Sequence, residues 1–320
     1  MSSPRISVII PTFNHARFIG QCIEGVLNQG HDSLEILVVD DGSTDSTKKV
    51  VAGFGDRIRY SYQKNQGQAT ARAFGIEQTT GELVGLLDSD DYWSDQFLST
   101  LLPMFQHPEV AIAFSNHDRV NAVGEAFEPN VFKNERPWLS PYIDPNSKNG
   151  WTILDETQAR RLYFSHFPHT PSGALFRRSH LQHLPDKRLR RGDDFLFFMD
   201  YVIASRCQVA FCTDVLWHLR THDTNIRQMN RSYGLLLEND IFAKEELLRK
   251  HHPELSRAER SLLKSKIATD YFDWAHGLSV QGAFRQAAVK YGQAALKGKG
   301  NTTSLRSILG LLKLPLKRLR

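Results

Sequence analysis

Residues 83–91 read LVGLLDSDD, five uncharged positions followed by an acidic cluster. The continuous apolar run over residues 83–87 predicts a strand buried on both faces, as in a parallel sheet covered by helices. Asp88, Asp90 and Asp91 then lie just beyond the carboxyl end of that strand. Ligands of such sheets bind at the carboxyl ends of the strands, so this stretch predicts a binding site as well as a fold.

The same order of elements repeats on both sides of this stretch, within the first 115 residues. Apolar runs that predict further strands lie at residues 6–10, 34–39, 58–62 and 110–114. Between these runs, apolar side chains recur with the spacing of amphipathic helices. Alternating strands and helices indicate βαβ units, so we predict an α/β, Rossmann-like fold with a mostly parallel central sheet.

The chain changes character twice after this region. Residues 116–170 hold five prolines and read as a hairpin near 116–132 followed by a long surface loop. Strand and helix patterns return over residues 171–220, and from Tyr233 the sequence is almost wholly helical. We therefore predict a domain over residues 1–230 with halves 1–115 and 116–230, a helical region over 231–302 and a basic amphipathic tail over 303–320.

The composition excludes several classes of protein. The chain has 320 residues, of which 41% are hydrophobic and 23% charged, as in globular proteins rather than fibrous or disordered ones. No apolar run approaches the roughly 18 residues of a membrane span, and residues 1–5 lead straight into a predicted strand, so no signal peptide is expected. Three cysteines without paired spacing argue against a disulfide framework or a zinc cluster and favour a cytoplasmic location.

The net charge of +5 is unevenly distributed. Residues 274–320 carry nine bases and no acid, whereas the other 273 residues carry 31 bases and 35 acids, a net charge of −4. The sequence therefore lacks a basic character over its whole length, and no nucleic-acid partner is expected.

The basic end of the chain also carries an apolar stripe. On a helical wheel, cations flank a face that holds Leu305, Ile308, Leu309, Leu312, Leu316 and Leu319. Such a face suits the surface of an anionic membrane, and it equally suits packing on the body of the protein. Pro315 would break or kink the helix, so both alternatives stay open.

Acidic residues at two strand ends are candidates for binding a nucleotide and a metal ion. Asp88 and Asp90 are alternate carboxylates that can hold a ribose hydroxyl and a hard divalent cation, Mg²⁺ or Mn²⁺, together. Asp91 is expected to cap the following helix. Of the adjacent pair Asp40 and Asp41, one can accept a hydrogen bond from a base or sugar while the other stays structural.

Two further segments carry charged candidates. Arg72 lies on the helix that residues 64–68 open, and it suits an anion or a base edge, with pairing to Glu77 as the alternative. Asp193 and Asp194 precede a strongly apolar helix, where a carboxylate is either a helix cap or a general base.

A strand predicted at residues 215–220 is followed by imidazole and guanidinium groups. His222 is a candidate metal ligand and Arg220 a candidate phosphate partner. His218 is assigned to an ordinary surface or core role.

Six motifs, each weak alone, occur in order with fitting spacings. They are residues 6–14 (ISVIIPTFN), 38–45 (VVDDGSTD), 65–76 (NQGQATARAFGI), 87–93 (LDSDDYW), 192–194 (GDD) and 220–225 (RTHDTN). With these motifs the chain resembles the family 2 inverting glycosyltransferases of the GT-A fold, over about residues 5–226.

The resemblance implies a role for individual residues. For nucleotide binding these are Thr12, Phe13, Asp41 and Arg72 at the base, and Asp88 at the ribose. For the metal they are Asp90 and His222, and for catalysis they are Asp194 as the base and Asp193 as its acidic neighbour. The departures are small: Phe13 stands where tyrosine is frequent, and Asp193 stands where glutamate is more usual.

The resemblance also implies an activity. A metal-assisted enzyme would move a sugar from a nucleotide-diphosphate sugar, by family a UDP-sugar, to the hydroxyl of a glycan or lipid-linked acceptor, in cell-surface glycan synthesis at the cytoplasmic side of a membrane. One alternative is a sugar-phosphate nucleotidyltransferase, which usually has a glycine-rich loop where this chain has residues 11–14 (PTFN). Another is a non-catalytic nucleotide-sugar-binding protein on the same fold.

Overall fold

The computed structural model describes residues 4–147, 150–189, 192–223, 233–298 and 302–312, together with Leu314. The chain forms two compact units, Met1–Asp223 and Thr224–Arg320. The boundary that the sequence predicts at residue 230 lies outside the described residues.

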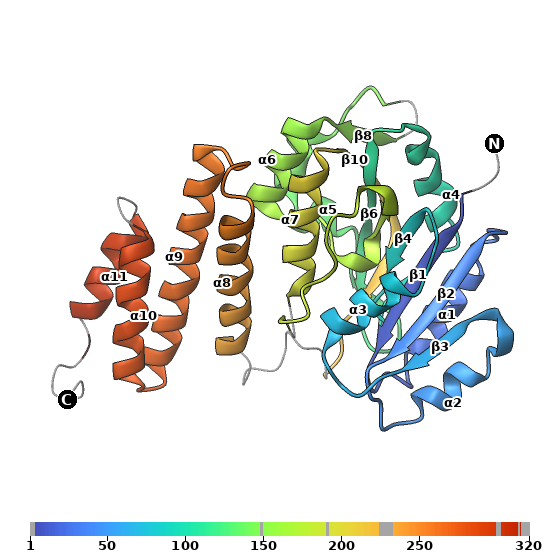
Figure 1. Cartoon of the computed structure of the whole chain (residues 1–320), viewed down its shortest axis with the longest axis horizontal. Helices are drawn as coiled ribbons and strands as arrows, with labels where there is room; N and C mark the ends of the chain where they lie inside the picture. Colours follow the sequence, from blue (N-terminus) through green and yellow to red (C-terminus); the bar gives the residue numbers. More distant parts are fainter. Residues whose placement is uncertain are drawn as a thin grey trace. The chain divides into compact units, whose positions relative to one another are not determined.

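One sheet organises the described part of the first unit (Figure 1). Its strands are β1 (Ile6–Thr12), β2 (Leu34–Asp40), β3 (Arg59–Tyr62), β4 (Leu83–Leu86), β5 (Tyr92–Trp93), β6 (Val110–Val120), β7 (Ala126–Glu128), β8 (Trp151–Leu154), β9 (Ala174–Arg177) and β10 (Gln208–Arg220). Their order is β3-β2-β1-β4-β9-β6-β10-β5, with β7 beside β6 and β8 beside β10. The pairings make β1, β2, β3, β4, β6 and β10 run in one direction, which confirms a mostly parallel sheet.

The helices of this unit pack their apolar sides into the core. They are α1 (Ile19–Leu27), α2 (Thr47–Ala52), α3 (Gln68–Glu77), α4 (Phe97–Leu101), α5 (Val131–Glu135), α6 (Glu156–His166) and α7 (Asp193–Ser205). Helix α1 buries Ile19, Cys22, Ile23 and Val26, the stripe that its sequence spacing predicts. Helix α3 approaches the sheet closely because Gly75 has no side chain: a Cβ there would lie 2.3 Å from Ile9 Cγ2.

The prediction of a long surface loop after residue 132 is wrong. This segment contains α5, β8 and α6, and β8 pairs with β10 inside the main sheet. Asp155 and Gln158 form a reciprocal capping box that starts α6, and the helix buries Leu162 and Tyr163. The prediction failed because it was drawn from the prolines of the segment, whereas its short elements are stabilised by caps and long-range pairing.

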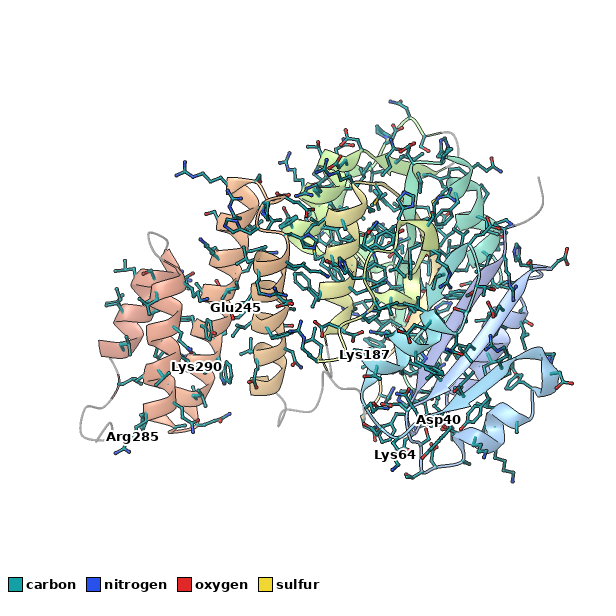
Figure 2. All side chains as sticks on the ribbon, viewed as in Figure 1. Asp40, Lys64, Lys187, Glu245, Arg285 and Lys290 are labelled. Carbon is teal, nitrogen blue, oxygen red and sulfur yellow. The ribbon has the colours of Figure 1, made fainter. Side chains whose placement is uncertain are left out.

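The second unit is helical in its described residues. It consists of α8 (Tyr233–Lys250), α9 (Arg257–Val280), α10 (Phe284–Lys297) and α11 (Thr302–Leu312). Ala275, Ala287 and Ala294 are fully buried, and their small side chains let the helices pack closely. Lys290, labelled in Figure 2, lies 3.6 Å from the centroid of the Trp274 ring. In the described part of the chain, every helix is too short or too polar to cross a bilayer.

Candidate active site

Several predicted site residues of the first unit follow the carboxyl ends of the same-direction strands. Thr12 ends β1, Asp40 ends β2 and Arg220 ends β10, while Asp88 comes two residues after β4. Because these strands run in one direction, their following residues meet at one edge of the sheet.

The end of β1 offers an open surface and an unused hydroxyl. Thr12 is 3% exposed, and its buried Oγ1 has no hydrogen-bond partner among the described residues. Phe13 beside it is 44% exposed, which is high for a phenylalanine. A buried hydroxyl without a partner and an exposed aromatic face together suit a planar, polar ligand such as a nucleobase.

The two adjacent carboxylates after β2 have different roles. Asp40 is fully structural, because it accepts hydrogen bonds from Tyr60 Oη at 2.7 Å and from the Ser43 backbone N–H at 2.7 Å. Asp41 accepts from the backbone N–H groups of Gln66 and Gly67, both at 2.8 Å. The backbone N–H groups before α3 therefore hold the carboxylate of Asp41.

A close backbone approach fixes this arrangement of Asp41. Gly42 has a φ of +91°, and a Cβ on it would lie 2.8 Å from the Asn65 backbone nitrogen. Only glycine satisfies both conditions, so the loop after β2 can lie directly against the loop before α3. Asp41 stays buried at 4% exposure between them.

Arg72 joins two distant parts of the sequence. Its guanidinium is 3% exposed and donates from Nη2 to Asp88 Oδ1 at 2.5 Å and from Nη1 to Asp193 Oδ2 at 3.0 Å. The predicted alternative of a surface pair with Glu77 is therefore wrong. Burial raises the pKa of both carboxyl groups, although the charge of Arg72 opposes this in each case. Burial acts to lower the pKa of the Arg72 guanidinium, but the negative charges of Asp193 and Asp88 outweigh burial and raise this pKa.

Helix α7 presents its two acidic residues in its first turn. The N-cap is Gly192, at a φ of +68°, so neither carboxylate occupies the capping position. Asp193 is 1% exposed, and its Oδ1 has no hydrogen-bond partner among the described residues. Asp194 is half-buried and follows directly. The Arg72–Asp193 ion pair thus fixes the start of the helix that carries Asp194.

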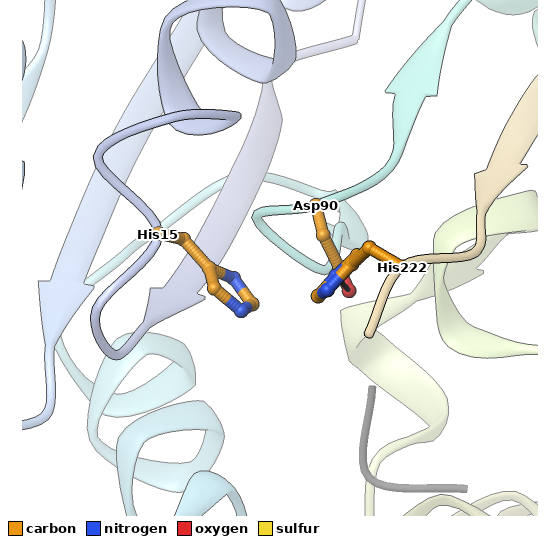
Figure 3. Close-up of side chains that lie close together, drawn as sticks. All are labelled: His15, Asp90 and His222. Carbon is orange, nitrogen blue, oxygen red and sulfur yellow. Dashed lines mark hydrogen bonds and ion pairs between the residues drawn. The ribbon is translucent and has the colours of Figure 1, made fainter. Parts of the chain in front are cut away.

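A second cluster brings three potential metal ligands together (Figure 3). His15 comes from the loop after β1, Asp90 from the turn after β4, and His222 from the segment after β10. One ligand atom of each lies within 4.8 Å of the others. His222 Nε2 is 3.0 Å from Asp90 Oδ2, and His15 Nδ1 is 2.8 Å from Ser89 Oγ.

The electrostatics of this cluster favour an ionised carboxylate at Asp90 and an unprotonated ring at His15. Burial acts to raise the pKa of Asp90, but the hydrogen bond from His222 and the charge of His15 outweigh it and lower this pKa. Burial lowers the pKa of His15, with Asp90 opposing. Ionised carboxylate and unprotonated imidazole are the forms that bind a divalent cation, so the cluster fits a metal ion.

Two neighbouring residues have structural roles that the sequence did not predict. Asp91 does not cap a helix; it accepts from Ser172 Oγ at 2.6 Å and from the Arg220 backbone N–H at 3.0 Å. Arg220 is 3% exposed, and its side chain donates to Asp90 O at 2.9 Å and to Gln21 Oε1 at 2.5 Å. Its guanidinium thus binds the protein, and its role as a phosphate partner stays a prediction.

The sequence reasoning missed His15, Gln68 and Ser172. Gln68 Nε2 donates to Asp88 Oδ1 at 2.7 Å, and Ser172 Oγ accepts from the Asp88 backbone N–H at 3.2 Å. His15 had a signal, because it comes directly after the polar residues that end the first predicted strand. Ser172 had no such signal in the sequence, because only the position of β9 in the folded sheet brings Ser172 to the site.

The family of the chain follows from a direct match. Residues 7–184, more than half of the chain, match the model of Glycosyl transferase family 2. The chain therefore belongs to this family, as the six motifs predict.

Relatives named as glycosyltransferases are similar to a part of the chain. An uncharacterised glycosyltransferase of Nostoc sp. is 41% identical over 110 residues, which are 33% of this chain and 34% of the relative. Glycosyltransferase GlyG of Streptococcus pneumoniae is 33% identical over 119 residues, which are 36% of this chain and 40% of the relative. The chain thus spans less than half of the length of these curated relatives.

Solved structures are similar over most of the chain. S. aureus TarS 1–349 in complex with UDP-GlcNAc has a TM-score of 0.69 and 19% identity, covering 92% of this chain and 81% of that one. Mannosyltransferase PcManGT from Pyrobaculum calidifontis, in complex with GDP-Man and Mn²⁺, has a TM-score of 0.57 and 18% identity, covering 99% and 83%. At such identities the likeness establishes the fold, which is of the GT-A type.

Proposed function

We propose that this chain is an inverting glycosyltransferase that moves a sugar from a nucleotide-diphosphate sugar to an acceptor hydroxyl. The observation that carries the proposal is the pair of clusters at one sheet edge: three potential metal ligands, and the Arg72 ion pair that fixes the start of the helix carrying Asp194. The UDP-GlcNAc bound to TarS supports a UDP-sugar as the donor. The GDP-Man bound to PcManGT makes a GDP-sugar the second candidate.

The donor would lie along the strand ends. Thr12, Phe13 and Asp41 would hold the base, where Thr12 Oγ1 supplies an unused polar atom and Phe13 an exposed ring. Arg72 would act indirectly, because its guanidinium holds the Asp88 carboxylate that faces the ribose. Asp193 Oδ1 would accept from a sugar hydroxyl.

Asp90 and His222 would hold the divalent ion, with His15 as a third ligand. Two imidazoles beside one carboxylate favour Mn²⁺ over Mg²⁺, because Mg²⁺ prefers an all-oxygen shell. When bound, the ion would neutralise the negative charge that develops on the departing diphosphate.

Asp194 would be the general base. Its carboxylate would take the proton of the acceptor hydroxyl as that oxygen attacks the anomeric carbon. Attack from the face opposite the diphosphate inverts the configuration, with no covalent bond to the enzyme. Its ion-paired neighbour Asp193 would keep the helix start in place during this step.

The acceptor is proposed to be a glycan or a lipid-linked saccharide that the enzyme meets at the cytoplasmic face of a membrane. Cys22, Cys207 and Cys212 are all free thiols in buried positions, which is consistent with a reducing compartment.

Nucleotide-sugar binding and turnover are tested separately. A thermal-shift screen of UDP-sugars and GDP-sugars should raise the melting temperature with the true donor when Mn²⁺ is present, since that ligand binds the native state. Donor hydrolysis or transfer should then release nucleoside diphosphate, disappear in EDTA and return with Mn²⁺. Release of pyrophosphate from a sugar phosphate and a nucleoside triphosphate would instead identify a nucleotidyltransferase, and donor binding without turnover would identify a non-catalytic binder.

A further inference from the structure

Helix α11 packs on its own unit with the face opposite its leucine stripe. Ser307 is fully buried, and a Cβ on Gly310 would lie 2.6 Å from Tyr291 Cε1. Leu311 and Leu314 belong to the same apolar cluster as Tyr291. The contacts with the body of the second unit are therefore made by a face of small and apolar residues.

The stripe that the sequence places on the other face is exposed. Leu305 is 62% exposed, Ile308 46% and Leu309 48%. These residues are spaced three and four apart and so form one side of the helix. Of the rest of the stripe, Leu316 and Leu319 lie outside the described residues, as do the cations Lys313, Lys317, Arg318 and Arg320. The alternative that the stripe packs on the body of the protein is therefore wrong for its described residues, because Leu305, Ile308 and Leu309 are exposed.

The neighbouring helix α10 adds exposed apolar residues. Val289 is 61% exposed and Leu296 69%, and they lie seven residues apart, on one side of that helix. A soluble surface rarely gathers large aliphatic side chains on consecutive helices unless they are covered by a partner.

The charge around this face selects the partner. Residues 274–320 carry nine bases and no acid. Arg306 and Arg285 are exposed on the same two helices. Two copies of such a cationic face repel each other, whereas an anionic lipid surface attracts the cations and accepts the aliphatic side chains below its headgroups.

We propose that Leu305, Ile308 and Leu309 of α11 insert into the interface of an anionic membrane, with the exposed Arg306 and Arg285 contacting its headgroups. Lipid binding requires neither donor nor metal, so this inference stands apart from the proposed catalysis.

The test uses the full chain with vesicles of phosphatidylcholine, with and without phosphatidylglycerol. The wild-type chain should bind the vesicles that contain phosphatidylglycerol and dissociate at high salt. Leu305→Ser, Ile308→Ser and Leu309→Ser combined should weaken binding by about 100-fold, and Arg306→Glu alone by about tenfold. All replaced side chains are exposed, so circular dichroism and the melting temperature should stay unchanged.

Matched controls lie in the first unit. Val123→Ser with Phe127→Ser replaces side chains that are 71% and 55% exposed, and Lys48→Glu repeats the charge reversal at an exposed site. Both should bind vesicles as the wild-type chain does. The proposal is overturned if the wild-type chain does not bind anionic vesicles or if the triple variant binds them as tightly as the wild-type chain. It is also overturned if the control substitutions weaken binding as much as the triple substitution. A wild-type dimer that the triple variant converts to a monomer, without vesicle binding, would assign the face to a second copy instead.

Discussion

Two clusters of ionisable side chains meet at one edge of the sheet, and they are built differently. In the first, the guanidinium of Arg72 lies between Asp88 and Asp193, so one cation serves two carboxylates. In the second, His15 and His222 place ring nitrogens around the single carboxylate of Asp90. The first cluster contains its own permanent cation and fixes positions, whereas the second gathers the ligand atoms that an added cation needs.

The largest expected effect concerns the residue that the first cluster positions. Asp194→Asn keeps the shape of the side chain but cannot accept the acceptor's proton, so transfer should fall by about 10²–10⁴-fold. Nucleoside diphosphate release measures the rate, and thermal shift with the donor should show binding unchanged. Asp95→Asn, at an exposed position near another helix start, should leave the rate unaffected. Nearly normal transfer by Asp194→Asn would leave Asp194 without a catalytic role.

The next effect is on folding. Arg72→Met leaves the buried Asp193 and the partly buried Asp88 without their cation, which should lower the free energy of unfolding by about 3–5 kcal/mol at neutral pH. Urea unfolding measures it. Lys187, labelled in Figure 2, pairs with Glu77 at 3.7 Å with both side chains well exposed, so Lys187→Met should cost about 1 kcal/mol at most. Equal losses for the two variants would contradict a structural role for the buried pair.

A smaller effect separates the second cluster from the first. His15→Ala removes one of three ligand groups and should weaken Mn²⁺ binding in the presence of UDP by about 10–100-fold, with little change in stability. Titration calorimetry gives the affinity. His31→Ala is the control, because His31 contacts Pro4 O near the start of β1, away from the strand ends of the site. Unchanged Mn²⁺ affinity in His15→Ala would reduce the site to Asp90 and His222.

The smallest effect concerns a buried histidine outside both clusters. Burial lowers the pKa of His169 to about 3, although its hydrogen bond with the Thr170 backbone acts in the opposite direction. The unfolded chain takes up a proton below its ordinary pKa of about 6.5, while the folded chain does not, so stability falls as the pH drops. The loss should reach about 2 kcal/mol at a pH of about 5.

The measurement for His169 is urea unfolding at two pH values. His169→Gln keeps an acceptor for Tyr163 Oη, which lies 2.6 Å from His169 Nε2, and should lose this pH dependence. His107→Gln, at an exposed histidine, should retain it. A wild-type chain equally stable at both pH values would show that His169 does not stay neutral in the fold.

The sequence predicted what local patterns determine. Apolar runs marked β1, β2, β3, β4 and β6, and the residues after them marked the sheet edge that holds the site. It could not predict the partner of Arg72, because Asp193 lies 121 positions away and only the folded sheet brings the two together. The helical wheel found the stripe of α11 but not which face packs, since Gly310 and Ser307 decide that by their fit against the unit.

The family motifs predicted the roles of some site residues but not all of their contacts. Asp90 and His222 lie in one cluster, as the resemblance implies, but it did not include His15. The buried contacts of Arg220 also could not be predicted, because an arginine after a strand has the same local pattern whether it binds a phosphate or the protein.

Strand β9 affects how the chain folds during its synthesis. It lies between β4 and β6 and pairs with both, yet it follows β4 only after residues 87–173 have been added. A ribosome adding about 5–20 residues per second leaves that edge of β4 open for roughly 4–17 s. During this interval the apolar residues 83–87 present unpaired backbone groups to any neighbouring nascent chain. Slowing translation between residues 87 and 173 should therefore increase aggregation more than the same delay placed after residue 177.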